Sequence, residues 1–202
     1  MPSQSRRRSA VTGTGSISPW PDTGAPAHYT DVLSFWQAHP AHWFAKDAAF
    51  DRLFRARFLS LHMSIVFRLR EAWRETPEGC LALIIMTDQF PRNAFRGTAR
   101  MYAADPLARW YARHALRAGC MQAVAPPLRV FFTLPFAHSE DPDDQAESVR
   151  LNAMLGEEYR KHAEGHRNII TRFGRFPHRN ALLKRETTPE ERRFLDEGGF
   201  SG

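Results

Sequence analysis

An amphipathic helix is encoded by residues 47–74, which read DAAFDRLFRARFLSLHMSIVFRLREAWR. Large apolar side chains recur along it at steps of three and four residues, at Phe50, Leu53, Phe54, Phe58, Leu61, Ile65 and Leu69. This spacing places them on one face of an α-helix and leaves most arginines on the other. The segment therefore predicts a long helix over 47–74 that packs one face against a helical core.

Four later segments carry the signature of a helix start, a capping residue followed by proline at the first helical position. They are Thr76-Pro77, Asp105-Pro106, Asp141-Pro142 and Thr188-Pro189, the last completed by Glu191 as a capping box. We expect a helix buried on every side over 80–86, a helix over 105–118 that ends at Gly119, a short apolar helix over 126–136, and a long helix over 141–170. Gly156 and Gly165 weaken the long helix, and we expect a break or kink near Gly165.

No strand pattern is present, because no hairpin dipeptide lies between alternating apolar and polar runs. We therefore expect an all-α fold, with antiparallel helix pairs stacked as a tetratricopeptide-like solenoid or as a compact helical array. No 34-residue repeat decides between the two. Residues 1–28 have the composition of a disordered tail, which leaves 29–202 as a single helical domain. Its first helix is expected to begin at Thr30 or Asp31 and to end at His39-Pro40, with Trp43-Phe44 filling the core behind it.

Composition limits the functional classes. The 202 residues suffice for one domain, or at most two, with a substantial core. Cys80 and Cys120 lie in apolar helical contexts without Cys-x-x-Cys spacing, which argues against a disulfide framework and a thiolate zinc site. No run approaches 18 apolar residues, and the N-terminus has no secretory-type apolar core, so we predict a cytoplasmic protein without a membrane span.

The net charge of +6 is unevenly placed. Between residues 166 and 185 there are six lysines and arginines and no acid. This balance favours an anionic partner, either a small phosphorylated or carboxylated molecule or a nucleic acid. Nucleic acid is the less favoured of these, since the aromatic residues follow helical core spacing and do not alternate with arginines on an exposed sheet.

A short motif occurs twice, as FPRN at 90–93 and as FPHRN at 176–180. Each copy sets a Phe that favours burial beside a Pro that stops a helix and an Arg-Asn pair rich in hydrogen-bond donors. We expect the two copies to converge on one polar site at the ends of buried helices. The ligand-binding residues expected there are Asp88, Arg92, Asn93, Arg96, Arg175, His178, Arg179 and Asn180.

Asp88 ends the most apolar helix of the chain and needs a partner if it is buried. Arg92 follows four residues on and Arg96 eight residues on. Two interpretations remain open: an aspartate–arginine network that locks the helix end, or an arginine that Asp88 orients to grip an anionic ligand.

The candidate acid–base residues are His138, Glu140 and His166. A histidine beside an acid at a helix start suits proton transfer or half of a metal site, although a structural hydrogen bond explains His138 equally well. His162 and His166 have metal-ligand spacing, but no Glu follows the first histidine as in zinc proteases. We predict neither a metal nor a cofactor. A glycine-rich phosphate loop and a Gly-x-Ser-x-Gly elbow are both absent.

The chain resembles the bacterial family catalogued as domain of unknown function 924. The matching segments are VLSFW at 32–36, WF at 43–44, FD at 50–51, LALI at 81–84, DQFPRN at 88–93, FRGT at 95–98, AD at 104–105, HSED at 138–141, DQ at 144–145, His166, RFGRFPHRN at 172–180 and TPEE at 188–191. The resemblance implies a helical, tetratricopeptide-like fold and implies no activity. Two departures are IVFR at 65–68, where small residues and an acid are expected, and Lys184, where Leu-Gly-Arg is usual.

Two functional classes follow from these patterns. The first is a pocket protein that binds a small anion in a basic cleft, with hydrolase-type acid–base chemistry left open. The second is a helical interaction module for a peptide or protein, in which the same polar residues are structural. Burial separates them, because the first requires an open cavity at the two motifs and the second requires that their side chains saturate one another.

Overall fold

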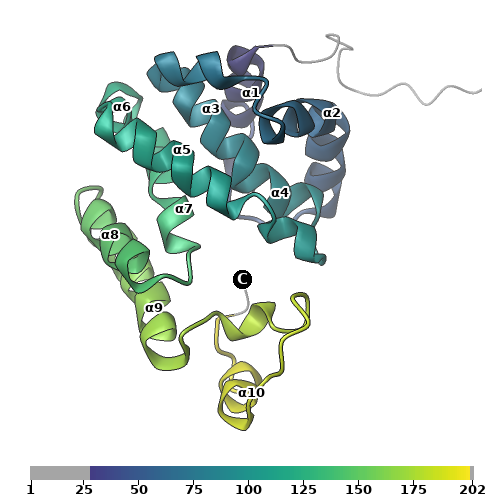
Figure 1. Ribbon diagram of the computed structural model, residues 1–202, viewed down its shortest axis with the longest axis vertical. Helices are drawn as coiled ribbons and strands as arrows, with labels where there is room; N and C mark the ends of the chain where they lie inside the picture. Colours follow the sequence, from purple (N-terminus) through teal and green to yellow (C-terminus); the bar gives the residue numbers. More distant parts are fainter. Residues whose placement is uncertain (1–27, 201–202) are drawn as a thin grey trace, which may run out of the picture.

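The computed structural model describes residues 28–200, and every regular element in that range is a helix (Figure 1). The α-helices are α1 (Tyr29–Gln37), α2 (Ala48–Val66), α3 (Pro77–Thr87), α4 (Gln89–Ala94), α5 (Asp105–Arg117), α6 (Cys120–Ala123), α7 (Leu134–Ala137), α8 (Pro142–Ala153), α9 (Glu157–Phe173) and α10 (Pro189–Asp196). Short 3₁₀ turns are η1 (Pro40–His42), η2 (Glu71–Glu75), η3 (Ala99–Tyr102), η4 (Pro126–Phe132) and η5 (Pro177–Arg179). The all-α prediction is confirmed.

Helix α3 is the centre of the core. Thr76 caps it by accepting a hydrogen bond from the Gly79 backbone at 3.0 Å, and Pro77 fills the first turn, as predicted. Every residue from 79 to 87 is buried, because α1, α2, α4, α5 and α6 all pack around it. An apolar helix without a polar face needs such a position.

The second half of the chain is arranged as a helix pair and a terminal segment (Figure 1). Helices α8 and α9 pack side by side, α7 connects them to the core helices, and α10 lies at the far end of the molecule. The described chain is thus a compact array of unequal helices. Tetratricopeptide-like stacking stays a prediction. No helix within 28–200 is long and apolar enough to cross a membrane.

The predicted helix over 47–74 was too long. Helix α2 ends at Val66, and Arg68 adopts the left-handed conformation, with φ of 63°. The Arg68 guanidinium then donates to Glu71 at 2.6 Å and lies 4.0 Å from the Trp110 ring. Consequently Leu69, which continued the apolar spacing, is 67% exposed. Local periodicity could not show this turn, because tertiary contacts stabilise it.

The predicted long helix over 141–170 is two helices, and the break lies at Gly156. Asp141 caps α8 as expected, donors being the backbone N–H groups of Asp143 and Asp144. Gly156 has φ of 140°, a conformation that L side chains rarely adopt. Gly165, where we expected the break, lies within continuous α9.

Four smaller expectations also need correction. The predicted helix over 126–136 is two pieces, the 3₁₀ turn η4 and the short helix α7. Helix α1 begins at Tyr29 and is capped by His28, not by Thr30 or Asp31; Asp31 instead completes the capping box. Asp105 lies inside α5 and makes no capping bond. Phe44 does not fill the core and is 67% exposed, although Trp43 does stack on Trp36. Apart from His28, the predicted disordered tail lies outside the described residues.

Candidate functional site

Asp88, at the C-terminal end of α3, is the centre of a buried polar network. It is 1% exposed and accepts hydrogen bonds from His138 Nδ1 at 2.8 Å and from the Gln89 side chain at 2.6 Å. Arg92 Nη1 lies 3.1 Å from the same carboxylate. Burial alone would raise the pKa of Asp88, but Arg92 and His138 hold it well below its usual range. The carboxylate is therefore ionised and fully partnered.

Arg92 bridges two carboxylates. Its guanidinium makes a bidentate pair with Asp105, at 2.9 and 3.2 Å, and also donates to the backbone oxygen of Asp88. Burial opposes its charge, yet Asp88 and Asp105 raise the pKa of Arg92. The proposed aspartate–arginine network is present for Arg92. Arg96, the other expected partner of Asp88, pairs with Asp51 at 2.6 Å.

Arg179, from the second motif, is largely buried like Arg92 but is poorly paired. It is 6% exposed and donates to the backbone oxygen of His138 at 2.9 Å. Its nearest carboxylate oxygen, on Asp105, is 3.9 Å away, and its Nε has no hydrogen-bond partner in the described chain. Burial and the nearby Arg92 lower the pKa of Arg179. The ring of Tyr102, 4.6 Å from the guanidinium carbon, supplies only a weak counterpart.

Arg92 and Arg179 meet at a cavity of about 200 Å³, which we call the basic cavity. It lies where α4, η5 and the loop between η1 and α2 approach one another. The residues that line it are Trp43, Phe44, Ala45, Lys46, Gln89, Arg92, Asn93, Arg96, Met101, Tyr102, Leu134, His138, His178, Arg179 and Phe200. Four of them are lysine or arginine, and none of these described residues is an acid.

A larger cavity of about 530 Å³, the apolar cavity, lies on the α8–α9 side of His138. It is lined by Phe44, Val130, Leu134, Ala137, His138, Asn152, Glu158, Tyr159, His162, Ala163, His166 and Phe200. The two cavities therefore share Phe44, Leu134, His138 and Phe200. The C-terminal Phe200 is placed there by ring contacts with His166 and His178, at 4.8 and 5.2 Å between centroids.

Several predicted ligand-binding residues are instead held by acids. Asp51 of α2 accepts from the Asn93 amide at 2.8 Å and from Arg96 at 2.6 and 3.1 Å. Glu191 accepts from Arg175 at 2.6 and 2.9 Å and from the Asn180 amide at 3.2 Å. Arg175 and Asn180 line neither cavity. Asn93 and Arg96, although paired with Asp51, do line the basic cavity.

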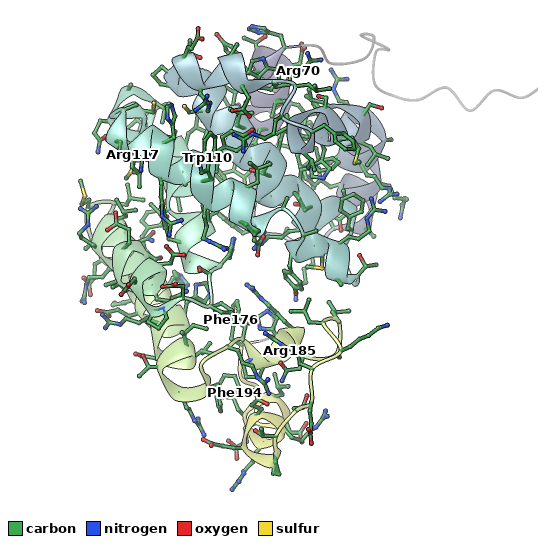
Figure 2. All side chains as sticks on the ribbon, viewed as in Figure 1. Arg70, Trp110, Arg117, Phe176, Arg185 and Phe194 are labelled. Atoms are coloured by element: carbon green, nitrogen blue, oxygen red, sulfur yellow. The ribbon has the colours of Figure 1, made fainter. Side chains whose placement is uncertain are left out.

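Of the candidate acid–base residues, Glu140 is engaged by an arginine and by the backbone. It accepts from Arg185 at 2.7 and 3.0 Å and from the Phe176 backbone at 2.8 Å, which anchors the second motif to the segment before α8. Figure 2 shows Phe176 and Arg185 between the upper helices and α10. Three donors engage its two carboxylate oxygens, so Glu140 holds the second motif in place, and its pairing with Arg185 opposes protonation by lowering the pKa of Glu140.

The histidines are distributed over both cavities. His138 lines both, His178 lines the basic cavity and His166 the apolar cavity. Burial, reinforced by nearby His138 and Arg179, lowers the pKa of His166 to about 3, and burial with Arg179 lowers the pKa of His178 to about 4. Burial and Arg92 also lower the pKa of His138, against the opposing effect of Asp88. The site therefore presents neutral imidazoles at pH 7.

The described part of the chain contains no group of three or more His, Cys, Asp or Glu side chains arranged for a metal ion. His162 and His166 both line the apolar cavity but have no third such ligand beside them.

Sequence reasoning did not identify three acids that pair with arginines in or near the two motifs, Asp51, Asp105 and Glu191. It also did not identify Lys46 and Tyr102, which line the basic cavity. Asp105 and Glu191 had been interpreted only as helix-start residues. Asp51, Asp105 and Glu191 do fall within the FD, AD and TPEE segments of the family resemblance, which is the one available signal.

Comparison with known proteins places the chain among uncharacterised relatives. The sequence model of a bacterial protein family of unknown function, DUF924, matches residues 32–199. A solved protein of unknown function from Agrobacterium tumefaciens is 55% identical and has a TM-score of 0.82, with 84% of this chain and 97% of that chain covered. No curated protein shows a significant match.

Proposed function

The chain belongs to the bacterial DUF924 family of unknown function, and we propose from its own geometry that the basic cavity binds a small anion, a phosphate or a carboxylate. The observation that carries the proposal is Arg179, a guanidinium that is 6% exposed, lines the cavity and, among the described residues, has no carboxylate within hydrogen-bonding distance. A buried charge without a partner is costly, and a bound anion would remove that cost.

The charge around the cavity supports this proposal. Four cations line it, Lys46, Arg92, Arg96 and Arg179. Asp88 and Asp105 pair with Arg92, and Asp51 pairs with Arg96; none of these three acids is a lining residue of the basic cavity. Among the described residues, Lys46 and Arg179 therefore lack a closely paired carboxylate. Arg179 is the buried one of the two, whereas Lys46 is exposed.

The size of the cavity limits the anion. At about 200 Å³ it holds the volume of roughly seven water molecules. Sites for drug-sized ligands are typically about 300–1,000 Å³. The basic cavity thus suits a single phosphate or carboxylate group, and a whole nucleotide would not fit inside it.

If the site is catalytic, His138 is the group best placed to move a proton. Asp88 fixes its Nδ1, so the other ring nitrogen carries the acid–base capacity, and the ring lines the basic cavity. Glu140 and His166 are poorer candidates, because Glu140 is paired with Arg185 and lines neither cavity, and His166 lines only the apolar cavity.

The test is isothermal titration calorimetry of inorganic phosphate at constant ionic strength with the wild-type protein, Arg179→Met and Arg179→Lys. A charged hydrogen bond contributes about 1.5–3 kcal/mol, so Arg179→Met should weaken binding about tenfold or more. Arg179→Lys should bind at an intermediate level, because lysine keeps the charge and loses the planar fork. Arg160→Met, on the exposed face of α9 and outside both cavities, is the matched control.

Arg92→Ala is a poor test of this proposal, because it leaves the buried carboxylates of Asp88 and Asp105 without their main partner. We expect it to lower the free energy of unfolding by about 3–5 kcal/mol whatever the cavity binds. The proposal fails if phosphate binds the wild type and Arg179→Met equally, or binds neither.

A second candidate function, a protein-interaction surface, is favoured by a separate apolar patch. Val66, Phe67 and Leu69 are 37%, 67% and 67% exposed at the turn after α2, and contiguous exposed apolar surface often marks an interface. If a second copy covers this patch, sedimentation velocity will show a dimer that Phe67→Ser with Leu69→Ser converts to monomer. A monomeric wild-type protein would exclude a second copy of this chain as the occupant of the patch.

A further inference from the structure

The basic and apolar cavities are neighbours with opposite character. They share Leu134 and His138, at the two ends of α7, together with Phe44 and Phe200. One side presents Arg179 and Lys46, while most of the other side is apolar, including Val130, Ala137 and Ala163. A ligand that occupied both would have a charged end and an apolar end.

The walls of the apolar cavity include side chains that are unusually exposed for their chemistry. Phe44 is 67% exposed, Phe200 41% and Tyr159 40%. All three line the apolar cavity. An apolar group bound there would remove aromatic surface from water on both partners, which stabilises the complex in proportion to the buried area.

Charge in the apolar cavity orients such a ligand. The one acid among its lining residues is Glu158, whose side chain is 79% exposed and lies 3.1 Å from Lys161. His166 is neutral at pH 7, because burial lowers its pKa to about 3. The described residues that line the apolar cavity therefore include no lysine or arginine for an anionic headgroup, and their one acid, Glu158, is already paired with Lys161. The headgroup belongs at Arg179 and the tail beyond His138.

We propose that the ligand is an amphiphilic anion, a phosphate or carboxylate that bears an alkyl or aryl tail, with its headgroup at Arg179 in the basic cavity and its tail in the apolar cavity. This inference rests on the proposed function and specifies the class of ligand. The apolar cavity, at about 530 Å³, lies within the usual range for organic ligands. The two cavities together thus accommodate an anion that is larger than phosphate and partly apolar.

The test is a calorimetric titration with n-alkyl phosphates from ethyl to octyl, each below its aggregation concentration and at fixed ionic strength. Each methylene that enters the apolar cavity should tighten binding about fourfold, from about 0.8 kcal/mol per buried methylene. The n-alkyl alcohols of the same lengths, which lack the headgroup, should bind far more weakly.

One variant and a matched control test whether the tail binds in the apolar cavity. Tyr159→Glu introduces a charge at the rim of the apolar cavity on a side chain that is 40% exposed, so we expect the fold to persist. It should flatten the chain-length dependence and leave inorganic phosphate binding unchanged. Met154→Glu is the matched control, because Met154 is 59% exposed in the same helix pair and lines neither cavity.

The outcomes separate the two proposals. If phosphate binds through Arg179 and lengthening the tail changes nothing, the further inference is wrong and the proposed function stands. If the alcohols bind as tightly as the phosphates, or Arg179→Met leaves the alkyl phosphates unaffected, the headgroup assignment is wrong. If neither phosphate nor any alkyl phosphate binds, both proposals are wrong.

Discussion

Glu191→Gln tests whether Arg175 and Asn180 stabilise the fold through their hydrogen bonds to Glu191. The Glu191 carboxylate is 2% exposed and accepts four hydrogen bonds, two from Arg175, one from Asn180 and one from the Thr188 backbone. Arg175 contributes most to lowering the pKa of Glu191, from 4.5 to about 2. Gln at this position would turn an amide N–H₂ group towards these donors, which cannot be accommodated without losing bonds.

The magnitude follows from the pKa difference. A pKa depressed on folding stabilises the folded state above the unfolded-state pKa, and that contribution is lost as pH falls towards the folded-state value. For a shift from 4.5 to about 2, the contribution at pH 7 is on the order of 3 kcal/mol. At pH 3, between the two values, roughly 2 kcal/mol of it should already be lost.

The assay is urea unfolding of the wild type and Glu191→Gln at pH 7 and at pH 3. The difference in free energy of unfolding between them should be on the order of 3 kcal/mol at pH 7 and roughly 1 kcal/mol at pH 3. Glu190→Gln is the matched control, because Glu190 is the neighbouring acid and its pair with Arg172 is about half exposed. That variant should change stability by less than about 1 kcal/mol.

A pH-independent difference between the wild type and Glu191→Gln would refute this reasoning. So would a Glu191→Gln effect no larger than that of Glu190→Gln. Phosphate binding should be the same in both variants as in the wild type, since Glu191 lines neither cavity.

Three further predictions concern the backbone and the cysteines. Lys184→Gly should raise the free energy of unfolding by up to about 1 kcal/mol in urea unfolding, because φ of 54° strains a side-chain-bearing residue, whereas Lys184→Ala should give no such gain. Gly156→Ala should lower the free energy of unfolding by about 1–2 kcal/mol, because φ of 140° is unfavourable for a residue with a side chain. Gly165→Ala, inside α9 with open space at its Cβ, should raise the free energy of unfolding by up to about 1 kcal/mol. Changes of the same sign in the two variants would contradict the break at Gly156. Burial beside Cys120 raises the pKa of Cys80 to about 12, so neither buried thiol should react with iodoacetamide at pH 8 until urea is added, and labelling of the native protein would contradict this.

Several helix starts can be predicted from the sequence, because local interactions determine them. The caps at Thr76, Asp141 and Thr188 act on neighbouring backbone groups, so the helix starts they predicted are confirmed. Helix ends were less readable. Arg68 ends α2 through contacts with Glu71 and Trp110, and Gly156 and Gly165 weaken a helix equally in sequence, so only packing of α8 on α9 decides which one breaks it.

For the candidate site, too, the sequence predicts one part of the arrangement and does not predict another. The repeated motif correctly indicated that Arg92 and Arg179 approach one place, since both line the basic cavity. It could not show that Arg92 is neutralised and Arg179 is not, because Asp105 serves one at 2.9 Å and the other only at 3.9 Å. Pairing between distant acids and arginines depends on helix orientation, which sequence spacing does not contain.

The most direct test of the central claim is a crystal structure of the protein grown with selenate, whose anomalous scattering locates a tetrahedral oxyanion independently of the protein model. The account predicts an anomalous peak in the basic cavity, with selenate oxygens about 3 Å from the Arg179 guanidinium. The same crystals of Arg179→Met should lack that peak. An empty cavity at selenate concentrations that occupy other basic surfaces, with Arg179 moved into a close pair with Asp105, would contradict the claim.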